Sequence, residues 1–394
     1  MPSRSPTGFS KGALQNLWRP ALAGPQVRLK ADPTCDFATR SKSSCRQTAS
    51  RRASSLVIAG LLSLGLAAPA AAQYSARRDG DVVRLEDART GTVVSIAPSL
   101  GDMAFEMKVK GHEILHFPYA SLDEFRARPG LAGVPLLAPW ANRLDEQAFY
   151  ANGRKYAFDM ELGNVRGAHP IHGFLRAASW EVVEVKADSQ AAWVTSRLEF
   201  FRQPDWMAQF PFAHTLEITY RLDRGMLEVD TRINNLSAEP MPVAIGFHPY
   251  LKLTDAPRDE WTVSIGARTE WTLAPDKIPT GETRPIEQLL PNPRAAVLKP
   301  LDLDHVFGDL IRDGSGRSMT SIKGKSQQIE IVMGPNYRAT VVYAPAGREF
   351  ICVEPMAGIT NALNLAHRGV YKELQTIAPG AVWEERFWIR PAGF

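Results

Sequence analysis

From about residue 80 onward, hydrophobic and polar residues alternate along short stretches of the chain. Alternation with a period of two gives a strand one apolar face, and β-branched and aromatic residues favour strands. Turn signals such as Asp79-Gly80, Asn152-Gly153 and Asp223-Arg224-Gly225 separate the stretches. We therefore expect strands over residues 81–85, 92–96, 180–185, 192–200, 214–220, 227–233, 328–332 and 340–343.

Helical periodicity is nearly absent, and the pattern predicts only two short helices, over residues 121–127 and 285–290. Many strands without helices between them are typical of an antiparallel sandwich or barrel. No low-complexity linker and no repeat of fixed period follows residue 80. The sequence thus predicts an all-β protein in which residues 73–394 form one large antiparallel β-sandwich domain.

The segment before this body has a different pattern. Arg51 and Arg52 precede the apolar run 56–68 and the small residues of 69–72, which are the three parts of a secretory signal. The apolar run is too short for a comfortable membrane span. We expect residues 51–72 to be a signal peptide cut after Ala72, with export to the periplasm. An uncleaved N-terminal membrane anchor is the alternative.

Residues 1–50 are polar, basic and without periodicity. Two interpretations stay open: a disordered extension, or upstream sequence included by a start codon assigned too early. Ser50-Arg51-Arg52 also hints at twin-arginine export, although the residues that follow fit that pattern poorly.

The charge is unevenly distributed and changes the view of possible partners. The chain has 46 Lys and Arg against 42 Asp and Glu, but ten of the basic and only two of the acidic residues lie in 1–72. The remaining body carries a formal charge of −4. Because binding to phosphate backbones needs a concentrated basic surface, nucleic acid is not expected as a partner.

Cysteine usage adds one expectation. Cys352 is the only cysteine of the body, so no intramolecular disulfide is possible there. It lies in the apolar stretch 350–353, where we expect a buried small hydrophobe rather than a reactive thiol.

The chemistry-bearing residues stand in unusual settings. The body has no Gly-rich phosphate loop, no paired-cysteine metal spacing and no nucleophile elbow, so no cofactor is expected. His248 instead lies directly before Pro249, which restricts its backbone to extended geometry. Histidine is the side chain best suited to proton transfer near neutral pH. Glu354 follows three apolar residues and precedes a proline. Burial of a carboxylate without a partner is energetically unfavourable, so this position favours a functional role over a packing role.

Five short segments carry such polar residues in a consistent order within residues 80–392. They are Pro139-Trp140-Ala141-Asn142-Arg143, Ile171-His172-Gly173-Phe174, Gly246-Phe247-His248-Pro249-Tyr250, Leu303-Asp304-His305-Val306-Phe307 and Val353-Glu354-Pro355. Together they resemble the aldose 1-epimerase (galactose mutarotase) family. Each segment alone is a weak signal, but five in register are a strong one.

The resemblance implies a β-supersandwich and interconversion of the α and β anomers of a free hexose, without a cofactor. It implies that Glu354 is the general base at the C1 hydroxyl and His248 the general acid at the ring oxygen. His172 would stabilise charge and hydrogen-bond the sugar. Asn142, Arg143 and Asp304 would bind the substrate. Opening a hemiacetal does need a base and an acid at neighbouring oxygens, each typically contributing about 10²–10⁴-fold.

Some assignments keep alternatives. Asp302 and His305 compete with Asp304, and His169 competes with His172. Family members that act on sugar phosphates also carry an arginine after the His-Gly segment, so Arg176 points to a hexose-6-phosphate mutarotase as a rival function. A non-catalytic carbohydrate-binding protein of the same fold is a second rival. A metal site formed by His172, His248, Asp304 and Glu354 is a third, with a spacing unlike local metal motifs.

Overall fold

The structure is a computed structural model that describes residues 72–161 and 164–394. The expectations for residues 1–50 and for the signal segment 51–72, apart from Ala72, lie outside the described residues. Within these residues no helix is long and apolar enough to cross a membrane.

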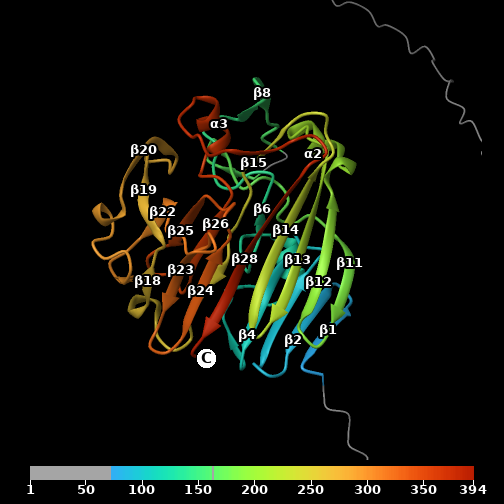
Figure 1. Ribbon diagram of the computed structural model, residues 1–394, viewed down its shortest axis with the longest axis vertical. Coiled ribbons are helices and arrows are strands. Elements are labelled where there is room, and N and C mark those ends of the chain that lie inside the picture. The colour runs from blue at the N-terminus through green and yellow to red at the C-terminus, as the bar shows by residue number, and fades with distance from the viewer. Residues whose placement is uncertain (1–71, 162–163) are drawn as a thin grey trace, which may run out of the picture. The chain divides into compact units, whose positions relative to one another are not determined.

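Three antiparallel sheets form most of the described chain (Figure 1). A nine-stranded sheet has the order β11 (Glu181–Ala187), β12 (Ala192–Glu199), β13 (His214–Asp223), β14 (Met226–Asn235), β28 (Val382–Ala392), β24 (Gln328–Met333), β23 (Ser318–Lys323), β18 (Thr262–Ser264) and β21 (Ala296–Val297). A five-stranded sheet comprises β1 (Tyr74–Asp79), β2 (Val82–Asp87), β3 (Thr92–Ala97), β4 (Met103–Val109) and β5 (His112–Glu113).

The third sheet carries His248, Asp304 and Glu354 on or beside its strands. Its order is β20 (Pro279–Pro285), β19 (Ala267–Leu273), β22 (Leu303–Leu310), β25 (Ala339–Ala344), β26 (Ile351–Met356), β16 (Gly246–Phe247) and β6 (Leu136–Leu137), and β17 (Tyr250–Leu251) also pairs with β26. Three two-stranded ribbons complete the strands: β7 (Ala148–Ala151) with β8 (Arg154–Ala157), β9 (Val165–Arg166) with β10 (His169–Pro170), and β15 (Met241–Val243) with β27 (Gln375–Ile377).

The sheets stack face to face around one large apolar core. Strands β1 and β2 contact β11 to β13, so the five-stranded sheet packs on one part of the nine-stranded sheet. The third sheet packs elsewhere on it, where the rings of Phe247 and Phe387 lie 4.9 Å apart. Along β13, buried residues alternate with partly exposed ones, which is the period-two pattern of the sequence. The predicted antiparallel sandwich is thus the architecture observed.

The helices differ from the expectation. Helix α1 (Leu122–Ala127) forms where predicted, because the Ser121 side chain accepts the Glu124 N–H at its N-terminus. The second predicted helix is only a 3₁₀ turn, Ile286–Gln288, since Pro291 follows closely and cannot continue it. The pattern missed α2 (Pro204–Gln209) and α3 (Ala362–His367), which are too short to show a period. Further 3₁₀ turns span Phe200–Arg202 and Arg258–Glu260.

One buried carboxylate lies far from any charge partner. Asp102, in the turn between β3 and β4, is fully buried and adopts a left-handed backbone with a φ of 49°. Its backbone carbonyl accepts the Tyr220 hydroxyl at 2.7 Å, but neither carboxylate oxygen has a hydrogen-bond partner. Burial raises the pKa of Asp102 to about 7, and the nearby Ser196 hydroxyl offsets this only in part.

Candidate active site

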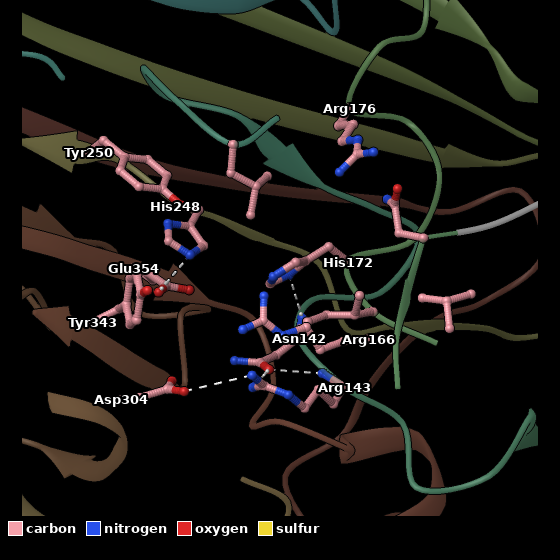
Figure 2. A pocket seen from close by; sticks show the side chains of 14 residues that line it. Asn142, Arg143, Arg166, His172, Arg176, His248, Tyr250, Asp304, Tyr343 and Glu354 are labelled. Atoms are coloured by element: carbon pink, nitrogen blue, oxygen red, sulfur yellow. Dashed lines mark hydrogen bonds and ion pairs between the residues drawn. The ribbon is translucent and has the colours of Figure 1, made fainter. Parts of the chain in front are cut away.

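The register of the third sheet places His248 opposite Glu354. Strands β16 and β17 both pair with β26, through Gly246 with Met356 and Tyr250 with Cys352. Both pairs follow the same register, in which His248 lies directly opposite Glu354. Directly opposite residues of antiparallel strands project from the same face of the sheet. The His248 Nε2 atom lies 3.2 Å from Glu354 Oε1, and both side chains are almost fully buried (Figure 2).

Two further residues of this sheet reach the same site. Asp304 pairs with Tyr343, and Tyr343 pairs with Cys352, so the three residues form one row across the sheet. The Tyr250 ring at the end of this row stacks on the His248 imidazole, with centroids 4.7 Å apart and planes 9° apart. The stack fixes the plane of the imidazole that faces Glu354.

The same register separates Asp304 from its competitors. Asp304 lines the site cavity, whereas His305, its neighbour along the strand, projects from the other face and lies 3.6 Å from Glu270. The Asp302 carboxylate accepts the Ala346 N–H at 3.2 Å. Of the three candidates, only Asp304 is therefore placed to contact a substrate.

The opposite wall of the site is built from two loops. Asn142 and His172 both have left-handed backbones, with φ of 59° and 60°. The Asn142 N–H donates to His172 Nδ1 at 3.1 Å, and the His172 N–H donates to the Asn142 carbonyl at 3.0 Å. Gly173 also has a positive φ, and a Cβ there would lie 1.9 Å from the Ala138 carbonyl oxygen. Only glycine fits this position, because the two loops touch through their backbones.

These bonds define the state of His172. Its Nδ1 accepts a backbone N–H, so a neutral ring must carry its proton on Nε2. Burial lowers the pKa of His172 well below its ordinary value, and His248, Arg143, Arg176 and Arg166 lower it further. His172 is thus a neutral donor through Nε2. The competing His169 has its Nδ1 3.0 Å from the Leu144 carbonyl and does not line the cavity.

Arg143 connects the loop wall to the sheet wall. The Asn142 side-chain oxygen accepts from the Arg143 backbone N–H at 2.9 Å and from its Nη1 at 3.0 Å. The Arg143 Nη2 atom lies 3.7 Å from Asp304 Oδ2. A dashed line marks this ion pair in Figure 2. The guanidinium is therefore fixed in orientation, with few degrees of freedom left to lose when a ligand binds.

These residues surround a cavity of about 350 Å³, which lies at the lower end of the volumes of small-molecule sites, about 300–1,000 Å³. All six residues predicted from the sequence line it. Sequence reasoning missed five lining residues, of which only Tyr343 had a usable signal, its place on a predicted strand. The missed residues are Leu131, Asn164, Val165, Arg166 and Tyr343.

The buried pair has one proton to share. Burial lowers the pKa of His248 to about 3 and raises that of Glu354 well above its ordinary value, with Asp304 raising the latter further. At pH values between these two pKa values, the pair holds one proton. The proton lies either on Glu354 beside a neutral His248 or on His248 beside an ionised Glu354. Burial favours the neutral arrangement, and the Arg143 guanidinium favours an ionised Glu354.

Two further expectations can be compared with the structure. Cys352 is fully buried, in a cluster with Tyr250 and Phe350, and burial raises the pKa of its thiol well above the ordinary value. No group of three His, Cys, Asp or Glu side chains with metal-binding geometry occurs in residues 72–161 and 164–394.

The family model of aldose 1-epimerase matches residues 91–390. A solved structure of a galactose mutarotase-like protein from Clostridium acetobutylicum is similar with a TM-score of 0.72 and 22% identity, over 82% of this chain and 98% of that one.

Two other solved structures share the architecture. Galactose 1-epimerase from Lactobacillus acidophilus NCFM has a TM-score of 0.65 and 15% identity, over 82% of this chain and 98% of its own. An aldose epimerase homologue from C. elegans has a TM-score of 0.63 and 17% identity, over 77% and 97%. At these identities the likeness shows the fold, and the predicted galactose mutarotase-like β-sandwich is confirmed.

Proposed function

Because this chain belongs to the aldose 1-epimerase family, we propose that it interconverts the α and β anomers of a hexose by acid–base-catalysed opening and closure of the sugar ring. The observation that carries the proposal is the buried contact of His248 Nε2 with Glu354 Oε1 at 3.2 Å, in a cavity of a volume suited to one sugar ring. Ring opening removes a proton from one oxygen and adds one to its neighbour, so the two groups must lie side by side.

The chemical step conserves atoms and charge. The Glu354 carboxylate takes the proton of the C1 hydroxyl, the C1–O1 bond becomes a carbonyl, and the bond between C1 and the ring oxygen breaks. Its electron pair stays on the ring oxygen, which takes the proton from His248 Nε2. Rotation about C1–C2 presents the other carbonyl face, and the reverse transfers close the ring as the other anomer.

The shared proton of the pair fits this cycle. The ionised arrangement, with the proton on His248, precedes ring opening, and the neutral arrangement follows it. The enzyme therefore returns to its starting state without releasing a proton to water. Burial favours the neutral arrangement, which is the state that follows opening. Bound sugar and the Arg143 guanidinium would stabilise the ionised arrangement, in which His248 carries the proton.

The remaining residues take binding roles in this proposal. The Nε2–H of neutral His172 donates to the oxygen that gains negative charge as the ring opens. Arg143, held by Asn142, and Asp304 bind sugar hydroxyls as donor and acceptor respectively. Fixed donors of this kind stabilise developing charge because they need little reorganisation.

The test follows the optical rotation of freshly dissolved α-D-glucose and α-D-galactose in the presence of the protein. We expect the wild type to speed the approach to equilibrium, and His248→Gln and Glu354→Gln to remove most of the acceleration. A wild type that matches buffer on every sugar contradicts the catalytic proposal and leaves the non-catalytic carbohydrate-binding alternative. Variants that match the wild type contradict the residue assignment.

A second candidate function is mutarotation of a hexose 6-phosphate. Arg166 and Arg176 line the cavity, and neither forms an ion pair or side-chain hydrogen bond with another described residue. Uncommitted guanidinium groups suit a phosphate. Export of the chain, which we propose from residues 51–72, favours a free sugar instead, because sugar phosphates are mainly cytosolic. Comparing kcat/KM for glucose and its 6-phosphate, with Arg176→Ala as the variant, decides between the two substrates.

A further inference from the structure

A cavity of about 410 Å³ lies over strands β18, β23, β24 and β28, which are neighbours in the nine-stranded sheet (Figure 1). No residue that lines it also lines the active-site cavity. Its lining holds four guanidinium groups but only one carboxylate. These five residues are Arg294, Arg312, Arg317, Arg390 and Asp313. We call this cavity the arginine cavity, and its charge favours an anionic ligand.

The floor of the arginine cavity is apolar. Met319 pairs with Val332 and Val332 pairs with Trp388, so these three side chains form one row across β23, β24 and β28. The next residue, Phe387, packs into the core against Phe247, so the row of Trp388 projects from the opposite, outer face of the sheet. Met319 and Val332 line the cavity, and Met319 is 43% exposed. The cavity therefore offers hydrophobic surface beside its charges.

Arg317 lies at the edge of this floor and is held in place from two sides. Its guanidinium carbon lies 4.1 Å from the centroid of the Trp388 ring, a cation–π contact that orients the side chain. The turn that carries it is fixed by Asp313, whose Oδ1 accepts the N–H groups of Ser315 and Arg317 at 2.8 and 3.0 Å. Within the described part of the chain, the Arg317 side chain forms no ion pair and no hydrogen bond. Its donors are therefore oriented and available to a ligand, which lowers the cost of ordering on binding.

The other three guanidinium groups add charge that the protein compensates only in part. Arg312 donates to three backbone carbonyls, at 2.6–3.4 Å on neither a carboxylate nor a phosphate, and Arg294 donates to one carbonyl at 3.2 Å. Arg390 Nη1 lies 3.1 Å from Glu330 Oε2. Four guanidinium groups against the carboxylates of Asp313 and Glu330 leave an excess of two positive charges. A ligand with one or two negative charges would balance this excess.

From this arrangement we propose that the arginine cavity binds a small organic anion, with its carboxylate or phosphate group on the guanidinium of Arg317 and its apolar body on Met319 and Val332. The planar fork of a guanidinium matches two oxygens of either group. The apolar floor favours an anion with a hydrophobic body over an inorganic ion. The enclosed volume lies within the range of small-molecule sites, about 300–1,000 Å³, which favours a small ligand over a polymer or a membrane surface. The inference goes beyond the proposed mutarotase function and does not depend on it.

The experiment titrates the protein with phenyl phosphate, benzoate, inorganic phosphate and benzyl alcohol in a calorimeter. We expect phenyl phosphate or benzoate to bind about tenfold more tightly than the last two probes, which offer only the charge or only the apolar body. Arg317→Ala should weaken this binding by about tenfold and Met319→Ser by about threefold, both with an unchanged Tm. Arg197→Ala is the matched control, because Arg197 lies on β12 of the same sheet, pairs with Glu217 and does not line the cavity.

The other outcomes overturn the proposal. Binding that is lost in Arg176→Ala and kept in Arg317→Ala places the anion in the active-site cavity. Equal losses in Arg317→Ala and Arg197→Ala mean that only the overall charge of the sheet face attracts the probes. Inorganic phosphate that binds as tightly as phenyl phosphate removes the role of the apolar floor. Binding of phosphatidylglycerol vesicles that depends on Arg317, without binding of either aromatic anion, indicates a membrane-facing surface instead.

Discussion

The two walls of the active-site cavity are built in different ways. On the sheet wall, His248 and Glu354 face each other because three strands pair in one register, and no unusual backbone is needed. On the loop wall, Asn142, His172 and Gly173 all have positive φ and are held by reciprocal hydrogen bonds. In the proposed function, the sheet wall supplies the two groups that exchange protons, whereas the loop wall supplies fixed hydrogen-bond donors.

The largest expected effect comes from the sheet wall. Glu354→Gln and His248→Gln should each lower kcat by about 10²–10⁴-fold with little change in KM, because each removes one partner of the proton exchange. The double variant should be hardly worse than either single one, since one group cannot complete the exchange alone. Polarimetric rates on glucose provide the measurement, and additive losses would show that the two groups act independently.

Gly173→Ala tests whether the loop wall is as constrained as its geometry implies. The new Cβ would meet the Ala138 carbonyl oxygen at 1.9 Å, so the loops must separate and displace His172. We expect at least a tenfold loss of kcat/KM and a lower Tm. Gly153→Ala is the matched control, because Gly153 has a similar φ of +74° but no atom within 4 Å of its Cβ. Equal behaviour of the two variants would contradict the constraint.

Arg143→Lys addresses the link between the walls. Lysine keeps the charge but cannot bond the Asn142 side chain and Asp304 with a planar fork. The expected result is a rise in KM of about tenfold and a smaller fall in kcat. Asp304→Asn should shift KM in the same direction. A selective loss of kcat in either variant would instead place the residue in the chemical step.

The smallest expected effect is that of pH on the pair. The pKa of His248 is lowered to about 3 and that of Glu354 is raised, so the single shared proton stays bound through the weakly acidic range. The profile of kcat/KM should therefore show no inflection near pH 6.5, the value of an ordinary histidine. Activity should fall on the alkaline side, where Glu354 loses the proton. An acid limb near 6.5 would mean that His248 titrates as an independent group.

The sequence predicted the sheet wall better than the loop wall. Alternation located the long strands β11 to β14 but not β4, β22 or β28. Short motifs identified His248 and Glu354, but nothing local shows that residues about a hundred positions apart face each other. Tyr343 was missed because lining a cavity depends on strand order, which alternation does not encode. Asn142 and His172 were found only through motif resemblance, since their hydrogen bonds join segments 30 residues apart.

Asp102 gives the fold a coupling to pH that is separate from the active site. The folded protein keeps a proton on this carboxyl up to a pH of about 7, whereas the exposed group releases it near 3.8. Folding between these values takes up a proton, so stability falls as pH rises through this window, by about 4 kcal/mol in total. Asp102→Asn, which suits the left-handed backbone, should remove this slope in denaturant titrations at pH 5 and 8. The core of this sandwich thus binds a proton whose stabilising contribution is complete below about pH 3.8 and is lost by about pH 7.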